Sequence, residues 1–114
     1  AGAAWDPQAF AAADTLEFLT VEDGDEHWST VLLVVLDGQV YLRLGSRAAA
    51  RFAANATRPL IKVRIAGQQF DQVTGEAAPD MAAAVDAAMA DKYTTDVFVR
   101  WMDHPLTLRL VPAG

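Results

Sequence analysis

The sequence predicts a small antiparallel β-barrel with helical additions, and three observations carry this prediction. Several short runs alternate apolar and polar residues or are rich in β-branched residues, as half-buried strands are. Glycine-containing steps that favour tight turns separate many of the runs, so most are expected to pair as hairpins. The chain has 114 residues, 53% of them hydrophobic, which suits one compact domain. We expect a single domain over residues 1–114, with residues 1–5 flexible.

The N-terminal third is predicted to contain one short helix and two strands. The helix is expected over Pro7–Ala13, because Asp6 is a candidate N-cap and a proline suits the first helical position. Strand-like runs cover Thr15–Val21 and Trp28–Leu36. The acidic segment Glu22–Glu26 is interpreted as a solvated loop between them.

A tight turn and a second helix follow. Asp37-Gly38 tolerates positive φ angles, so the strand before it should pair with Gln39–Leu44 as a hairpin. After Gly45 the sequence becomes Ala-rich with apolar residues at helical spacing, which predicts a helix that has Ser46 as its cap. Asn55 is expected to end this helix in the left-handed conformation.

The next segment predicts a half-exposed strand and a return strand. Apolar residues at 61, 63 and 65 alternate with Lys62 and Arg64. Gly67 marks a second reversal into a less regular strand over residues 69–78, in which Gly75 indicates either a bulge or a close approach.

The C-terminal part predicts a helix and a closing strand. Asp80 can cap a helix that runs to Lys92, with Met81, Val85, Ala88 and Met89 on one face. Residues 93–104 fit a helical turn or a strand, and we favour the helix. Leucines at 106, 108 and 110 alternate with polar residues as a last strand. Six strands and about three short helices therefore indicate an α+β, mainly β, Greek-key-like antiparallel barrel.

Composition excludes several classes of protein. The net charge of -6 argues against general nucleic-acid binding, which needs a broad positive surface. The longest apolar run, Val31–Leu36, is far shorter than the roughly 20 residues that span a bilayer, so we expect a chain that does not enter the membrane. Because the chain has no cysteine, we expect a reducing compartment, by default the cytoplasm.

Positive charge is concentrated in one stretch. Six of the nine basic residues lie between Tyr41 and Ile65, and no Asp or Glu occurs between Asp37 and Asp71; the six are Arg43, Arg47, Arg51, Arg58, Lys62 and Arg64. A strand that ends in Gly-Ser and opens a helix presents free N–H groups, a hydroxyl and the positive end of a helix dipole. We therefore interpret this corner as a candidate phosphate site. The alternative is that Ser46 is only a cap and the arginines pair with carboxylates elsewhere.

The segment VYLRLGSRAAARFAANATRPLIKVRIAGQQFDQVTGEA resembles the core of the FMN-binding split-barrel family, which includes pyridoxamine-phosphate oxidase-like proteins and deazaflavin-dependent relatives. Ser46-Arg47 matches the step that holds the flavin phosphate, and Gly75-Glu76-Ala77 matches a later Gly-small turn. Asn55 stands where an Asn-Pro helix end occurs in the family. Ala48 replaces a second basic residue of the oxidases. The C-terminal part is similar to an uncharacterised branch.

The resemblance implies a six-stranded split barrel that binds FMN or a deazaflavin, acts as a small oxidoreductase and forms a homodimer. It places the cofactor phosphate at Arg43, Ser46 and Arg47, with Lys62 and Arg64 widening the positive surface. Ser29 and Thr30 would approach the ring or the ribityl chain. Because the cofactor carries the chemistry, no side chain is needed as a catalytic acid or base. The alternative is a cofactor-free barrel that serves as a ligand-binding or interaction module.

The sequence gives little indication of a metal site or of a Ser-His-Asp hydrolase. A metal would need the two histidines, His27 and His104, to converge with carboxylates such as Glu26 or Asp103, and their spacing does not require it. A Ser-His-Asp hydrolase built on Ser29 or Ser46 lacks a nucleophile-elbow pattern. The large aromatic residues, which could stack on a ring, are more typical of a core or a subunit interface; they are Trp5, Trp28, Trp101, Tyr41 and Tyr93.

Overall fold

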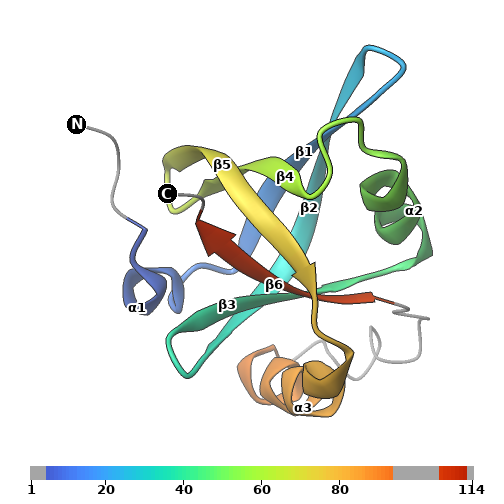
Figure 1. Cartoon of the computed structure of the whole chain (residues 1–114). Coiled ribbons are helices and arrows are strands. Elements are labelled where there is room, and N and C mark those ends of the chain that lie inside the picture. The colour runs from blue at the N-terminus through green and yellow to red at the C-terminus, as the bar shows by residue number, and fades with distance from the viewer. Residues whose placement is uncertain (1–4, 94–105, 113–114) are drawn as a thin grey trace.

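A computed structural model describes residues 5–93 and 106–112 of the chain. Six antiparallel strands close into a barrel in the order β1-β2-β3-β6-β5-β4, as the sequence predicts (Figure 1). In chain order the elements are α1 (Pro7–Phe10), β1 (Thr15–Glu22), β2 (Asp25–Leu36), β3 (Gln39–Leu44), α2 (Ser46–Ala54), β4 (Leu60–Ile65), β5 (Gln68–Ala77), the 3-10 turn η1 (Pro79–Met81), α3 (Ala82–Lys92) and β6 (Leu106–Pro112).

The strand order contains the predicted Greek key. The strands β1, β2 and β3 are joined by hairpins, and β4 returns to lie beside β1, which gives the spatial order 4-1-2-3. The connection from β3 to β4 runs through α2, so the barrel topology itself places this helix next to the end of β3 (Figure 1).

Three two-residue turns connect the hairpins. Asp37-Gly38 forms the predicted turn, with φ angles of 50° and 73°, and Ala66-Gly67 makes the reversal expected at Gly67. The acidic segment Glu22–Glu26 is exposed, as predicted, but it contains a tight turn instead of a longer loop. Asp23-Gly24 makes an equally tight turn with φ angles of 54° and 83°, so both strands run up to it and the acidic side chains lie on a hairpin tip. The same Asp-Gly signal was present in the sequence at this point.

The main core fills the barrel. Side chains that alternate along each strand point inward, among them Leu16, Phe18, Leu33, Leu42, Val63 and Leu108, each at most 1% exposed. The predicted inward row of β4, at 61, 63 and 65, is buried, while Lys62 and Arg64 are exposed. Trp5, Phe10 and Phe70 contact one another edge-to-face, with ring centroids 5.0–5.7 Å apart, and pack against this core from α1 and β5.

A smaller core lies outside the barrel wall, under α3. Val34 and Tyr41 point outward from β2 and β3 and are buried with Val85 and Met89 of the helix. This confirms the helix face that the sequence predicts, on which Met81 and Ala88 also pack. The cap prediction is wrong, because Asp80 lies inside the 3-10 turn η1 and makes no side-chain cap hydrogen bond.

The other predicted helix ends also differ from the structure. The first helix ends at Phe10 instead of Ala13, because Phe10 turns into the core, and Asp6 makes no capping side-chain bond. Gly45 is the N-cap of α2, and Ser46 is its first helical residue. Asn55 is extended, with φ of -63° and ψ of 124°.

The Asn55 side chain explains its extended backbone. Its Oδ1 accepts the N–H of Val21 at 2.9 Å, and its Nδ2 donates to the carbonyl of Leu60 at 3.1 Å. The next residue, Ala56, donates its N–H to the carbonyl of Val21 at 2.7 Å. Asn55 and Ala56 thus provide hydrogen-bond partners for the backbone N–H and C=O of Val21 at the edge of β1. A left-handed turn at Asn55 would not provide them.

Gly75 is a site of close approach, one of the two alternatives predicted for it. A Cβ at Gly75 would lie 2.8 Å and 3.0 Å from two ring atoms of Phe52. The ring of Phe52, a residue of α2, therefore rests directly on the backbone of β5. The irregularity of β5 lies elsewhere: its register with β4 shifts between Val73 and Phe70, so Asp71 and Gln72 oppose a single residue.

The end of α3 completes the edge of β2. Strand β1 begins opposite Leu32, so it offers no partner to Leu33. Tyr93 Oη donates to the Leu33 carbonyl at 2.7 Å and accepts its N–H at 3.2 Å, and Lys92 Nζ donates to the same carbonyl at 3.0 Å. Tyr93 is extended; the rest of the segment predicted as helical, 94–104, lies outside the described residues. No helix in the described parts of the chain is long and apolar enough to cross a membrane.

Replacing Gly75 by Ala should destabilise the protein by about 1–3 kcal/mol, because the new methyl group would overlap the Phe52 ring. Urea denaturation monitored by tryptophan fluorescence measures the change. The matched control is Gly75→Ala combined with Phe52→Leu, in which the smaller side chain makes room. If the costs of the two substitutions simply add, the contact does not constrain the helix.

Replacing Tyr93 by Phe should cost about 1–3 kcal/mol, because Leu33 loses the hydroxyl that satisfies its backbone. Burial raises the pKa of Tyr93 above its ordinary value of 10.0. The unfolded chain therefore releases this proton first, and the hydroxyl's contribution is complete below pH 10 and falls as pH rises further. Denaturation curves of wild type and Tyr93→Phe should therefore be separated at pH 8 and should converge as the pH is raised above 10. A difference in the free energy of unfolding that does not change with pH would contradict this. Burial also lowers the pKa of Lys92, but Lys92 is present in both proteins, so its titration does not create a difference between them.

Candidate functional site

The corner between β3 and α2 carries an open helix N-terminus. Gly45 is the extended N-cap, and the first intrahelical bond runs from the N–H of Ala49 to the Gly45 carbonyl. The N–H groups of Ser46, Arg47 and Ala48 therefore have no partner within the helix. No side chain among the described residues caps them, and the first turn contains no acidic residue. Because Ser46 and Arg47 are both exposed, this corner can receive an anion from solvent.

Arg43 lies on β3, three residues before Ser46, but its side chain is directed toward α3. Its side chain is only 3% exposed, and its Nη1 lies 3.2 Å from Oδ1 of Asp86 on α3. The Asp86 carboxylate is 59% exposed. The structure thus places Arg43 under α3, where it joins the helix to the barrel.

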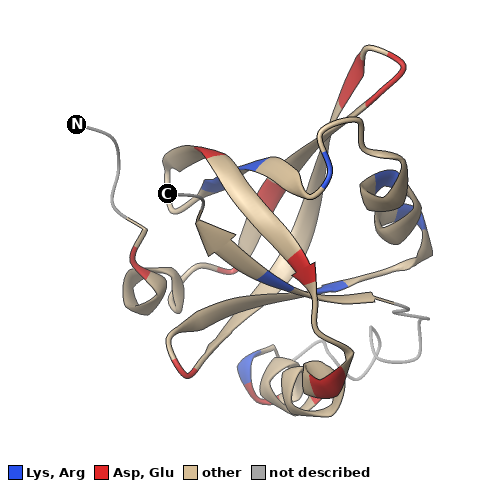
Figure 2. Ribbon diagram, viewed as in Figure 1, with Lys and Arg blue, Asp and Glu red and all other residues tan. Residues whose placement is uncertain are grey.

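Lys62 and Arg64 lie on a different wall from the corner. Strand β4 is three strands away from β3 in either direction around the barrel, so the two strands stand on opposite sides. The basic residues are accordingly spread over several elements of the fold (Figure 2). Within one chain, the predicted cofactor residues fall into two groups.

The second group is a polar row on the outer wall of the barrel. Thr30 on β2 is opposite Glu17 on β1, which is opposite Arg64 on β4. Thr30 and Arg64 are exposed, and Lys62 lies two residues along on the same face. Ser29 points the other way, into the barrel. It is 6% exposed, and its Oγ is a buried side-chain atom without a hydrogen-bond partner among the described residues.

Arg109 was not a candidate in the sequence analysis, and Trp28 was considered there only as an aromatic residue typical of a core or a subunit interface. Arg109 of β6 is opposite Tyr41 of β3 and Glu76 of β5, and its Nε donates to the Tyr41 hydroxyl at 3.2 Å. This hydrogen bond, helped by the negative charges of Glu76 and Asp80, raises the pKa of Arg109. Trp28 lies under Arg64, with the guanidinium carbon 3.9 Å from the ring centroid. Only strand register could have revealed either pairing.

The described residues give no support to a metal centre. No group of three or more His, Asp or Glu side chains among residues 5–93 and 106–112 is arranged to hold a metal ion. His27 is exposed near the acidic hairpin tip, and His104 lies outside the described residues. The tip of this hairpin, which carries the acidic residues, projects away from the barrel (Figure 2).

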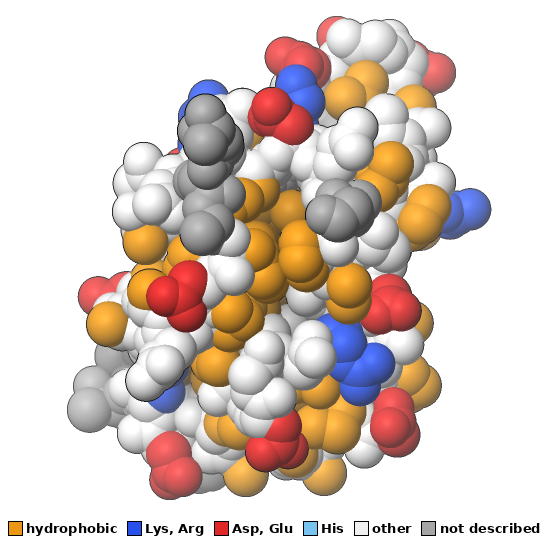
Figure 3. Space-filling model, turned by 60° about the vertical axis from the view of Figure 1, so that its left-hand side comes forward, with side chains coloured by type: hydrophobic (Ala, Val, Ile, Leu, Met, Phe, Trp, Pro, Cys, Tyr) orange, Lys and Arg blue, Asp and Glu red, His pale blue; other side chains and the backbone are white. Residues whose placement is uncertain are grey.

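One face of the molecule is hollow and hydrophobic. The side that carries α1 and the β4–β5 turn shows a band of hydrophobic side chains in its middle, with charged side chains around the margin (Figure 3). A contiguous apolar area with a polar rim is typical of a surface that binds another molecule.

Comparisons with known proteins give similarity in structure only. No family model matches the sequence, and no curated protein matches it. The crystal structure of HutZ, the heme storage protein from Vibrio cholerae, matches with a TM-score of 0.67 at 16% identity, over 94% of this chain and 87% of HutZ.

Two other similar structures are of proteins named for flavin-type cofactors. A FAD-binding protein from Mesorhizobium loti matches with a TM-score of 0.62 at 13% identity, over 94% of this chain and 86% of its own. An F420-H2 dependent reductase matches with a TM-score of 0.61 at 12% identity, over 86% and 93% respectively. These likenesses, together with the closed six-stranded antiparallel barrel, show that the chain shares the split-barrel fold of these three proteins.

Proposed function

We propose that this protein binds the phosphate of a flavin-type cofactor, FMN or a deazaflavin, at the corner formed by Gly45, Ser46 and Arg47, and that it acts as a small oxidoreductase. The observation that carries the proposal is the first turn of α2. It combines N–H groups that have no partner within the helix, an exposed hydroxyl and an exposed guanidinium, and it contains no acidic residue. Such a turn attracts an anion through both hydrogen bonds and the helix dipole.

The presence of Arg47 in this turn also favours a bound anion. The positive end of the helix dipole repels a cation, so Arg47 is unfavourable there by a few tenths of a kcal/mol up to about 1 kcal/mol. A phosphate at the N–H groups would reverse the sign of this interaction and accept charge-assisted hydrogen bonds from the guanidinium. Arg43 is buried against Asp86, so a direct contact with the phosphate would require α3 to shift; in our proposal Arg43 positions that helix.

The residues at the corner fit a phosphate group and would supply binding and orientation. The cofactor ring, when bound, supplies the hydride or electron transfer. We further propose that the protein is a homodimer, because the hydrophobic hollow of Figure 3 suits a subunit contact. In such a dimer Thr30 and Lys62 of one copy would have access to a cofactor held by the other, which a single chain does not allow.

A second candidate function is a cofactor-free barrel that stores or carries a ligand. Two observations favour it. Ala48 occupies the position of a second basic residue, and Arg43 is buried, so Arg47 is the exposed cation in the first turn of α2. In addition, HutZ is a storage protein for heme and has the highest TM-score of the three structures compared.

Visible-absorbance titration of the purified protein with FMN, riboflavin and F420 tests the main proposal. FMN or F420 should bind saturably, and riboflavin, which lacks the phosphate, should bind at least about tenfold more weakly. Arg47→Gln should weaken binding of the phosphorylated cofactor by about tenfold and leave riboflavin unchanged. Arg58→Gln is the matched control, because Arg58 is equally exposed but follows the far end of α2.

Equal affinity for FMN and riboflavin would show that the corner is not the anchor. Absence of any absorbance change with FMN and F420, in a sample that sedimentation shows to be folded and dimeric, would favour the cofactor-free module.

Stability should separate the roles of the two arginines at β3 and α2. Arg43→Gln removes a buried guanidinium from its ion pair with the exposed Asp86, and also removes the packing of its stem, so we expect a loss of about 1–3 kcal/mol. Arg47→Gln replaces an exposed residue and should change stability by less than about 0.5 kcal/mol. Urea midpoints give both values. Comparable losses for the two variants would mean that Arg47 has a structural role.

A further inference from the structure

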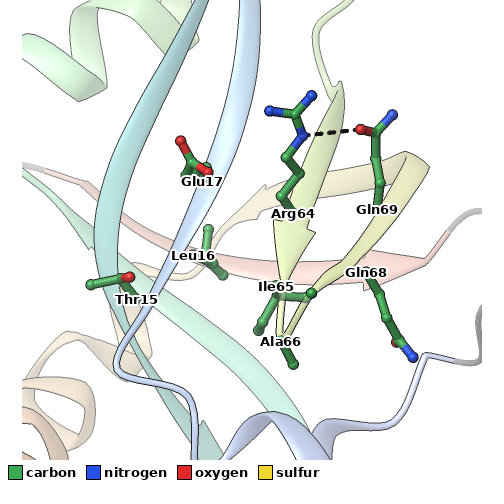
Figure 4. Close-up of a pocket in the computed structure, with 9 residues that line it drawn as sticks. Thr15, Leu16, Glu17, Arg64, Ile65, Ala66, Gln68 and Gln69 are labelled. Atoms are coloured by element: carbon green, nitrogen blue, oxygen red, sulfur yellow. Dashed lines mark hydrogen bonds between the residues drawn. The ribbon is translucent and has the colours of Figure 1, made fainter.

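The barrel opens into a cleft between β1 and the β4–β5 hairpin. Pairing between β1 and β4 covers only three positions and ends at the pair Glu17 and Arg64. Beyond this pair, β1 continues through Leu16 to Thr15, while β4 turns away at Ala66-Gly67. The resulting cleft has a volume of about 440 Å³, within the range of small-molecule sites, and is lined by both strands and the turn (Figure 4).

Thr15 offers backbone groups to this cleft. Alternate residues of a strand direct their N–H and C=O groups to the same side. In β1, Val21 directs both groups away from β2, toward Asn55 and Ala56. Thr15 has the same parity, so its N–H and C=O face the β4 side, where no residue of β4 pairs with it. The cleft thus contains one donor and one acceptor that a ligand can use.

The guanidinium of Arg64 is held in place at the rim. It stacks on Trp28 at 3.9 Å, and its Nε donates to Gln69 Oε1 at 3.0 Å. Gln69 is fixed in turn, since its Nε2 donates to Asp71 Oδ1 at 2.8 Å. These contacts involve one face of the guanidinium and its Nε. The two terminal nitrogens of Arg64 can therefore donate to another group. A pre-oriented guanidinium edge of this kind suits a carboxylate.

Glu17 provides the opposite charge on the other lip. Its Cα is directly opposite that of Arg64, and the two side chains extend from neighbouring strands on the same side of the sheet (Figure 4). No ion pair joins them in the described part of the chain. Two opposite charges are therefore held beside one cleft without neutralising each other.

We propose that this cleft binds a small zwitterion of the amino-acid class. The ligand carboxylate is held by Arg64, its ammonium group by Glu17, and its remaining polar atoms by the backbone of Thr15. The site lies on the opposite wall of the barrel from the Ser46 corner, so it is additional to the proposed cofactor site. Lys62, on the same strand as Arg64 but outside the lining of the cleft, takes no part.

Isothermal titration calorimetry with L-leucine and L-glutamine tests this site. At least one of them should bind saturably. The corresponding N-acetyl derivative lacks the ammonium group, and the corresponding amide lacks the carboxylate, so each should bind at least about tenfold more weakly. Arg64→Gln should weaken amino-acid binding by about tenfold or more and leave binding of the amide unchanged. Glu17→Gln should do the same and leave binding of the N-acetyl derivative unchanged.

Lys62→Gln is the matched control, because it removes a positive charge from the same face and should leave affinity unchanged. Circular dichroism confirms that each variant is folded, and Glu17→Gln carries the test if Arg64→Gln is not. Absence of saturable heat with both amino acids overturns the proposal. Equal affinity for the amino acid and its N-acetyl derivative also overturns it, because the site would then bind an anion only.

Discussion

The contact between the Phe52 ring and the backbone of Gly75 determines where α2 lies, and the candidate cofactor site depends on that position. The helix is short, and Phe52 is its one buried residue, so its orientation is set largely by this side chain. Any residue larger than glycine at position 75 would displace the ring. At its other end, the helix is continuous with β3 through Gly45. A buried contact on β5 thereby fixes an open N-terminus on the far side of the helix.

Much of the fold could be predicted from sequence because strands and tight turns leave local signals. The alternation at Ile61–Ile65 and the Asp37-Gly38 turn were read correctly, since each depends on a few neighbouring residues. Helix ends were read less well. Asn55 was expected to stop α2 by adopting a left-handed conformation, yet it is extended because its side chain completes the edge of β1, 34 positions away in the sequence. A hydrogen bond between residues so far apart in the chain leaves no signal in the local sequence.

The basic residues that are concentrated in one stretch of the sequence lie on different parts of the folded protein. Greek-key topology sends β3 and β4 to opposite walls, so residues close in the chain serve different places. Arg43 joins α3 to the barrel through Asp86, Arg47 remains at the open helix end, and Arg64 stacks on Trp28 beside the cleft. Their separation follows from strand order, which charge counting cannot reveal. It also places the exposed Arg47 and Arg64 on opposite sides of one acidic chain.

The central claim is that the first turn of α2 binds a phosphate. Backbone amide chemical shifts, recorded by ¹⁵N-¹H NMR during titration with FMN and with inorganic phosphate, test it most directly, because the amide groups of Ser46, Arg47 and Ala48 are the proposed donors. These three amides should move most with both ligands, and the amides of β4 should not respond to phosphate. Shifts that cluster on β4 or α3 while residues 46–48 stay unchanged would contradict it.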